Sequence, residues 1–243
     1  MTRVKKAKIN KSMDEKARPL INIAALEKVR KTIKTEANSK IIPKIIAVTK
    51  TRPIEAVRAA LKENLFIVGE NQVQEAEQKF LKDTKIREKV ELHLIGSLQS
   101  NKVKRAINLF DVIQTVDSIK LLKKINNQAE KIKKKQKVFM QINIGRDKNK
   151  RGFGSEEIFE ACKEARKLKN IEVKGLMTIL PFGKTKKENE KLFTETKIIQ
   201  EKIEKNYILS CKETSMGMSG DYIEAVKSGA TLIRIGSAFF GPR

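Results

Sequence analysis

Short runs of β-branched and other apolar residues alternate with longer amphipathic stretches from residue 44 to the end of the chain. The stretches between the runs carry apolar residues at helical spacing, for example Ile54, Val57 and Leu61. Strand-like runs that alternate with helical patterns predict βαβ units and a parallel sheet. The eight predicted strands are Ile45–Lys50, Phe66–Gly69, Glu91–Ile95, Val112–Thr115, Val138–Ile144, Val173–Thr178, Leu209–Thr214 and Leu232–Ile235.

The number of repeats favours one arrangement of such a sheet. Eight strand–helix repeats predict closure into a (β/α)₈ TIM barrel, because an open doubly wound sheet usually has fewer strands and needs covered edges. A length of 243 residues also fits one barrel domain. Since only Gly236–Arg243 follows the last strand, the last helix is expected to be short or missing.

An extra helix is predicted before the first strand, with Pro19 in its first turn. Its apolar positions recur at helical spacing: Ile23, Leu26, Val29 and Ile33. This helix can cover the gap that a missing last helix would leave in the outer ring. Residues 1–18 are basic and predict a flexible tail, and residues 19–243 predict a single barrel domain.

Rare residue types argue against several kinds of site. The cysteines Cys162 and Cys211 lie far apart, which argues against a disulfide framework and fits a reducing compartment. The single histidine, His93, argues against a zinc site or a Ser-His-Asp triad. Apolar runs stay well below the roughly 18 residues of a membrane span, and the basic N-terminus lacks the apolar segment of a secretory signal. A cytoplasmic protein without a metal or membrane site is therefore expected.

The formal net charge of +24 has two interpretations. One is nucleic-acid binding through phosphate neutralisation, and the other is a lysine-rich solvated surface. Most lysines fall on predicted helices mixed with Glu, and the chain has two tyrosines and no tryptophan to stack bases. The solvated surface is the favoured interpretation.

Candidate chemistry gathers where the predicted strands end, which is where barrel enzymes carry their sites. The first strand ends at Lys50, and the second leads into Glu70 and Asn71. A lysine amine forms a Schiff base with an aldehyde only when neutral, and partial burial would favour that form. The alternative is an ordinary solvated lysine, and position alone does not select Lys50 from the many others.

The last two loops suggest a phosphate site. Ser215–Asp221 (SMGMSGD) precedes a predicted helix at Tyr222–Lys227, so glycines, hydroxyls and helix N–H groups come together. Gly236 and Ser237 follow the eighth strand and can add backbone donors. Barrel phosphate sites often use these two loops, so their pairing favours phosphate binding over the alternative, an ordinary helix cap.

Long ordered motifs then indicate a family. AVTKTRP, VGENQVQE, ELHLIGSLQSNK, QINIGRDKNKRGF, GLMTI and ETSMGMSGDYIEAVKSGATLIRIGSAFFG follow one another between Ile45 and Arg243. In these motifs the chain resembles the pyridoxal phosphate homeostasis proteins. The resemblance implies a fold similar to the barrel domain of alanine racemase.

The resemblance also implies which residues bind the cofactor, pyridoxal 5'-phosphate (PLP). It places the Schiff base on Lys50, and it leaves Arg234 either facing the pyridine nitrogen or locked in the barrel wall. Lys150 matches a family lysine near the pocket mouth, in a stretch that is unusually basic here. His93, Cys162 and Cys211 are expected to be structural. The other implied cofactor-binding residues are Asn71, Ser215, Gly217, Met218, Ser219, Gly236 and Ser237.

The function that the resemblance implies is intracellular PLP homeostasis, by buffering or delivery, without evident catalysis. Alanine racemase adds a β-domain whose tyrosine supplies a second base across the dimer, whereas Tyr207 and Tyr222 are not obvious second bases. The expected partners are PLP and PLP-dependent apo-enzymes as recipients, and the expected state is a monomer. The alternatives are a weak PLP-dependent amino-acid racemase and, from another class, a nucleic-acid-binding protein.

Overall fold

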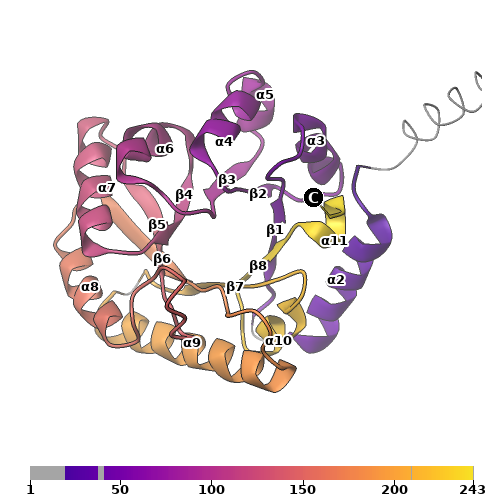
Figure 1. Cartoon of the computed structure of the whole chain (residues 1–243). Coiled ribbons are helices and arrows are strands. Elements are labelled where there is room, and N and C mark those ends of the chain that lie inside the picture. The colour runs from indigo at the N-terminus through magenta and orange to yellow at the C-terminus, as the bar shows by residue number, and fades with distance from the viewer. Residues whose placement is uncertain (1–19, 38–40, 209, 243) are drawn as a thin grey trace, which may run out of the picture.

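Eight parallel strands close into a barrel in which each strand pairs with its neighbours in sequence and β1 also pairs with β8 (Figure 1). The computed structural model describes residues 20–37, 41–208 and 210–242. The strands are β1 (Lys44–Val48), β2 (Ile67–Glu70), β3 (Glu91–Leu94), β4 (Val112–Val116), β5 (Gln136–Gln141), β6 (Ile171–Met177), β7 (Glu213–Met218) and β8 (Leu232–Ile235). The predicted (β/α)₈ barrel is confirmed.

Helices surround the barrel as an outer ring (Figure 1). They are α2 (Ile23–Glu36), α3 (Ile54–Lys62), α4 (Val73–Phe80), α5 (Thr84–Arg87), α6 (Val103–Leu109), α7 (Ile119–Lys131), α8 (Glu157–Arg166), α9 (Lys186–Asn206), α10 (Tyr222–Lys227) and α11 (Ser237–Phe240), with a 3₁₀ turn η1 at Ser100–Lys102. In the part of the chain that the structure describes, no helix combines the length and apolar character needed to cross a membrane.

Two apolar layers hold the fold together, as expected for a barrel inside a ring of helices. The inner layer fills the barrel with side chains that include Ile46, Val112, Phe139 and Met177. The larger outer layer packs the strands against the apolar faces of the helices. These inner side chains close the barrel below its carboxyl-end rim, so that the polar residues that follow the strands are held on a rigid base.

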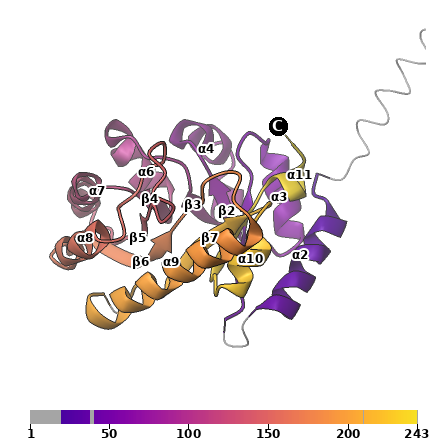
Figure 2. The same cartoon turned by 60° about the horizontal axis from the view of Figure 1, so that its bottom comes forward.

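The additional N-terminal helix, α2, lies beside α10 and α11 (Figures 1 and 2). Asn22 caps it by accepting from the Ala25 amide at 3.0 Å, and the Asn22 amide donates to the Phe239 carbonyl at 2.8 Å. Because α11 has only four residues, α2 fills the gap that was predicted. Pro19 and the expected tail at residues 1–18 lie outside the described residues, so the division into tail and barrel domain stays a prediction.

The seventh strand differs from its prediction. We expected Leu209–Thr214, but β7 begins at Glu213 and continues to Met218, and Leu209 lies outside the described residues. Ser210 instead forms part of a turn, and its hydroxyl donates to the Val173 carbonyl at 2.9 Å. The strand accommodates Gly217 at φ 86° through an irregular register with β8. A Ser-Met-Gly-Met sequence resembles a loop because it lacks β-branched residues.

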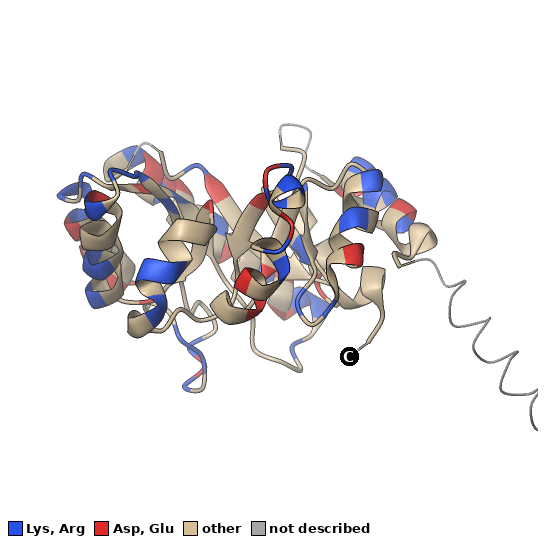
Figure 3. Ribbon diagram, turned by 90° about the horizontal axis from the view of Figure 1, so that it is seen from above, with Lys and Arg blue, Asp and Glu red and all other residues tan. Residues whose placement is uncertain are grey.

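The other strands lie where the pattern placed them, with ends that differ by at most three residues. Lys and Arg residues are distributed around the outer helices and loops with Asp and Glu among them (Figure 3). Ion pairs such as Lys163–Glu160 and Lys123–Glu164 join some of these charges. This distribution fits a solvated basic surface.

Candidate functional site

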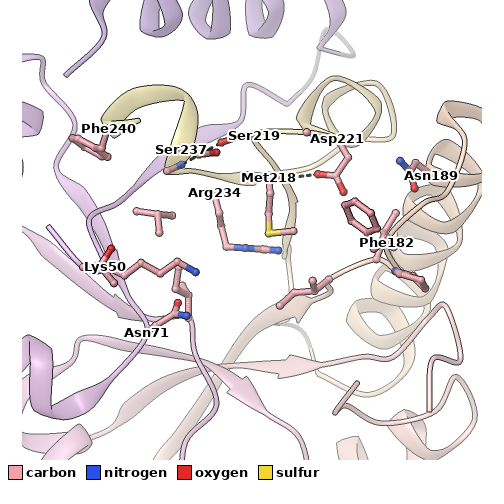
Figure 4. Close-up of a pocket in the computed structure, with 18 of the residues that line it drawn as sticks. Lys50, Asn71, Phe182, Asn189, Met218, Ser219, Asp221, Arg234, Ser237 and Phe240 are labelled. Atoms are coloured by element: carbon pink, nitrogen blue, oxygen red, sulfur yellow. Dashed lines mark hydrogen bonds between the residues drawn. The ribbon is translucent and has the colours of Figure 1, made fainter. Parts of the chain in front are cut away.

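A cavity of about 600 Å³ opens at the carboxyl ends of the strands. Seven of the nine residues predicted to bind a cofactor line it: Lys50, Asn71, Met218, Ser219, Arg234, Gly236 and Ser237. Lys50 and Asn71 enter from the loops after β1 and β2, and Ser219 and Ser237 lie across from them (Figure 4). The structure therefore brings together the end of β1 and the last two loops, which are far apart in sequence.

Lys50 follows β1 after a single residue, Thr49, and its half-buried side chain extends into the cavity (Figure 4). A tight turn shapes this segment: the Arg52 amide donates to the Thr49 carbonyl at 3.0 Å, and Thr51 has a left-handed φ of 61°. A non-glycine residue in this conformation needs support from its surroundings. The backbone around Lys50 is thus held in one defined shape.

A buried ion pair between Lys79 and Glu70 provides that support. Lys79 Nζ lies 2.6 Å from Glu70 Oε1 and donates to the Thr49 carbonyl at 2.9 Å. The Thr49 hydroxyl donates to the same Glu70 oxygen at 2.6 Å, and the Thr51 amide donates to Glu75. Burial raises the pKa of Glu70, and the Lys79 ammonium opposes that rise. Glu70, which we noted at the rim, is in fact fully buried beneath it.

Sequence reasoning missed Lys79. Its signal was present, because Lys79 shares the buried face of α4 with Val73, Ala76 and Phe80. A lysine on the apolar stripe of a short helix needs a buried partner, and Glu70 supplies it.

Backbone donors converge on Ser219 between the last two loops. The Ser219 hydroxyl oxygen accepts from the amides of Gly236 and Ala238 at 3.4 and 3.3 Å. Because the hydroxyl oxygen accepts from both amides, its own proton is left to donate to a phosphate. The Cβ of an alanine at Gly236 would lie 3.2 Å from Val48 Cβ, so the chain approaches β1 closely here.

Asp221 is the residue before α10, but its side chain does not cap that helix. It turns back instead and accepts from the Met218 amide at 2.6 Å (Figure 4). Burial raises the pKa of the Asp221 carboxyl, which the nearby Arg234 charge partly offsets. The ordinary side-chain cap that we weighed for this loop is therefore absent at Asp221.

Ser215 and Gly217, both predicted to bind the cofactor, lie on β7 and are not among the lining residues. Ser215 is fully buried in the barrel, where its hydroxyl contacts Gln114 and Arg234. Gly217 faces α10, and a Cβ there would lie 2.5 Å from Ala225 Cβ. Because the strand continues beyond its predicted end, these two residues stand behind the cavity wall.

Arg234 combines the two positions that the sequence left open. It lines the cavity and is also fixed in the barrel, since Nη1 donates to Ser215 Oγ at 2.9 Å and Nη2 to the Thr178 carbonyl at 2.8 Å. Only 3% of the residue is exposed. Burial lowers the pKa of its guanidinium to about 10, and Asp221 counteracts that effect.

Residues at the mouth include Lys150, which lines the cavity as expected. Its amine donates to the carbonyls of Ile179 and Leu180, and burial lowers its pKa. We missed Phe182, whose side chain is fully exposed at the rim, and Asn189 on α9 (Figure 4). The Pro-Phe-Gly-Lys turn after β6 was the available signal for this part of the wall.

His93 and the cysteines are buried away from the cavity lining. His93 Nδ1 lies 2.7 Å from Gln114 Nε2 inside the barrel. Both thiols are free, and burial raises the pKa of Cys162 to about 12. The expected packing role of the cysteines is confirmed.

Comparison with known proteins gives the family. Residues 21–243 match the family model of the alanine racemase N-terminal domain. The pyridoxal phosphate homeostasis protein of Synechocystis is 37% identical over 200 residues, which cover 82% of this chain and 91% of the relative. Its Aquifex aeolicus counterpart is 32% identical and covers 90% of this chain and 95% of that relative.

Solved structures agree. PipY of Synechococcus elongatus with PLP bound has a TM-score of 0.80 and 31% identity over 90% of this chain and 99% of its own. Clostridium difficile alanine racemase has a TM-score of 0.62 at 20% identity, with 90% of this chain and 56% of that enzyme covered, and shows the fold alone. The chain belongs to the pyridoxal phosphate homeostasis protein family and has the fold of the alanine racemase N-terminal domain.

Proposed function

We propose that this protein holds PLP as a Schiff base on Lys50 and serves intracellular PLP homeostasis, by buffering or delivering the cofactor. The observation that carries the proposal is that Lys50 and the donor cluster at Ser219, Gly236 and Ser237 line one cavity. The bound PLP in the PipY structure and the names of the relatives support it.

The residues present fit the three chemical parts of PLP. Its aldehyde needs a lysine amine, which Lys50 supplies. Its phosphate needs several donors, for which the Ser219 hydroxyl and the Ser237 amide are available, beside the Gly236 amide that now donates to Ser219. Asn71 and Arg234 are left to contact the ring, and the buried guanidinium offers donors to a ring acceptor.

Holding the cofactor is the role that the residues support best. PLP supplies an electron sink, but a reaction also needs acids and bases placed by the protein. The two tyrosines, Tyr207 and Tyr222, lie outside the cavity lining. Lys150, a candidate for a second base at the mouth, already donates to two carbonyls. We therefore propose a carrier without evident catalysis.

Within this proposal, PLP-dependent apo-enzymes receive the cofactor, the protein acts as a monomer, and it works in the cytoplasm. The free, buried thiols of Cys162 and Cys211 support a reducing compartment. A cavity open at the rim, with Phe182 exposed beside it, gives the cofactor a way in and out.

Titration of the purified protein with PLP tests binding. We expect one equivalent to bind and to give a visible absorbance band that Lys50→Ala abolishes. Lys44→Ala is the matched control, because Lys44 is an exposed lysine at the other end of β1. A band of equal strength in Lys50→Ala would reject the proposed attachment.

Incubation with a panel of L-amino acids separates the carrier from the weak racemase. We expect neither D-isomer nor keto acid beyond the amount of protein present. Product that accumulates to many equivalents per protein molecule, and disappears in Lys50→Ala, would favour the racemase instead.

A further inference from the structure

A line of four hydrogen-bonded side chains crosses the interior of the barrel. Arg234 on β8 donates to Ser215 on β7 at 2.9 Å, Ser215 donates to Gln114 on β4 at 2.7 Å, and Gln114 Nε2 lies 2.7 Å from His93 Nδ1 on β3. All four are at most 3% exposed. We call them the interior chain. It begins at Arg234, which lines the cavity, and ends at His93, which does not.

The hydrogen bonds of this interior chain run in one defined direction. A guanidinium has only donors, so Ser215 Oγ must accept from Arg234, and its own proton goes to Gln114 Oε1. The Gln114 amide then presents N–H to His93. His93 Nδ1 is thereby the acceptor, and the imidazole proton sits on Nε2.

The far end of the chain faces Glu91. His93 Nε2 lies 3.6 Å from Glu91 Oε1, and this contact holds the pKa of the Glu91 carboxyl below its usual range. The negative Glu91 carboxylate favours a protonated Nε2–H facing it over an unprotonated Nε2 with its lone pair. Both ends of the imidazole therefore favour the same tautomer.

Hydrogen bonds connect the four side chains from Arg234 to His93 Nδ1, whereas His93 Nε2 has no hydrogen-bond partner among the described residues and meets Glu91 only as a charge at 3.6 Å. The barrel interior around the interior chain is apolar, with Val112, Phe139 and Met177 among its side chains. A buried polar network that is only partly satisfied is less stable than an apolar core. The buried Arg234 guanidinium is influenced by the Asp221 charge, but its hydrogen bonds within the described residues go to Ser215 and the Thr178 carbonyl, which fix its position.

We propose that Ser215, Gln114 and His93 are positioning residues that together hold the Arg234 guanidinium at the inner wall of the cavity, with His93 as its Nε2–H tautomer. The family resemblance placed Ser215 in the phosphate cradle, whereas its contacts place it in this chain. The proposed effect on ligand binding rests on PLP as the ligand, but the tautomer does not.

Nitrogen-15 NMR of the imidazole tests the tautomer in protein without PLP, because His93 is the only histidine. We expect the Nε2–H tautomer in wild type and a change of the Nδ1 signal in Gln114→Met and in Ser215→Ala. Gln136→Met is the matched control: Gln136 is an equally buried glutamine on β5 that bonds only to backbone carbonyls. A wild-type Nδ1–H tautomer, or an Nδ1 signal that is unchanged in both Gln114→Met and Ser215→Ala, would overturn the proposal.

PLP binding tests the effect on Arg234. We expect the PLP dissociation constant to rise about tenfold in Gln114→Met and in Ser215→Ala, to stay near wild type in Gln136→Met, and to recover in Ser215→Thr, which restores a hydroxyl. PLP should also shift the His93 signals in wild type but not in Gln114→Met.

The two measurements fail separately. If wild type does not bind PLP at all, the proposed function fails while the tautomer result stands. If PLP binds equally well in wild type, Gln114→Met and Ser215→Ala, the positioning role is wrong even though the proposed function holds.

Discussion

Lys79 Nζ lies 2.6 Å from Glu70 Oε1 in a buried ion pair, and the same ammonium donates to the carbonyl of Thr49, the residue before Lys50. The pair thus joins α4 to the end of β2 and to the segment that carries the proposed cofactor lysine. Among the described residues Glu70 Oε2 has no hydrogen-bond partner, so the carboxylate depends on Lys79 for its charge balance. This dependence has consequences for stability and for its variation with pH.

Lys79→Met should destabilise the protein by about 3–5 kcal/mol, because it leaves a buried carboxylate without its cation. Chemical denaturation measures the change in the free energy of unfolding. Lys163→Met is the control, since Lys163 forms an exposed pair with Glu160 and its loss should have little effect. Equal effects of the two substitutions would show that the buried pair has no special role.

The loss in Lys79→Met should depend on pH. Burial raises the pKa of Glu70 even with Lys79 present, and removing the ammonium raises it further. A carboxyl whose pKa is higher in the folded state favours folding when protonated, and this contribution fades as the pH rises through the folded-state pKa. The difference in the free energy of unfolding between wild type and Lys79→Met should therefore become smaller as the pH falls toward 4.5.

The double variant Lys79→Met/Glu70→Gln checks that assignment. It removes the titrating group, so its own free energy of unfolding should vary less with pH between neutrality and 4.5 than that of Lys79→Met. If the free energy of unfolding of the double variant changes with pH as much as that of Lys79→Met, another group is responsible.

Gly217→Ala should destabilise the protein by roughly 2–4 kcal/mol. An alanine there must adopt a φ of 86° and place its Cβ 2.5 Å from Ala225 Cβ, which combines the left-handed penalty with overpacking. Gly183→Ala is the matched control, because Gly183 has a similar φ of 81° but nothing within 4 Å of an added Cβ. It should lose only about 1 kcal/mol, and thermal or urea unfolding of both variants provides the comparison.

Much of the fold could be predicted because most strands and helices have a recognisable local pattern of apolar and polar residues. The limits of β8 were predicted at Leu232–Ile235 as they are found, and α2 was placed by its apolar stripe. The end of β7 could not be predicted, because a Ser-Met-Gly-Met strand is stabilised by pairing with β6 and β8 rather than by its own residue types.

The candidate site divides in the same way. Positions such as Lys50 and Ser219 follow from strand order alone, since residues after parallel strands meet at one rim. Selecting Lys50 among the many lysines required the family motifs. The roles of Lys79 and Gln114 could not be predicted, because they depend on contacts between elements that are distant in sequence. Lys79 contacts Thr49, and Gln114 contacts Ser215.

Neither thiol should react in the folded protein. Burial raises the pKa of Cys162 to about 12 and that of Cys211 above its usual range, so at neutral pH both are buried thiols rather than thiolates. Iodoacetamide should modify neither residue under native conditions and both in denaturant, as intact-mass spectrometry will show. Rapid native modification of either would contradict the packing described for them.

Binding to nucleic acid should be weak and lost at physiological salt. The net charge of +24 will attract polyanions at low ionic strength, but along the described ribbon the basic residues are interspersed with acidic ones (Figure 3), so we expect this attraction to be screened by salt. A salt titration of binding to duplex DNA and to RNA measures this. Micromolar affinity that persists at physiological salt would support the nucleic-acid alternative.

Borohydride reduction tests the central claim most directly. The protein is loaded with PLP, reduced and digested, and the peptides are mapped by mass spectrometry. We predict that the cofactor is fixed to a single peptide at Lys50, and that Lys50→Ala yields no modified peptide while Lys44→Ala matches wild type. Fixation at Lys150 or another lysine in wild type, or an unchanged yield of reduced cofactor in Lys50→Ala, would contradict the account.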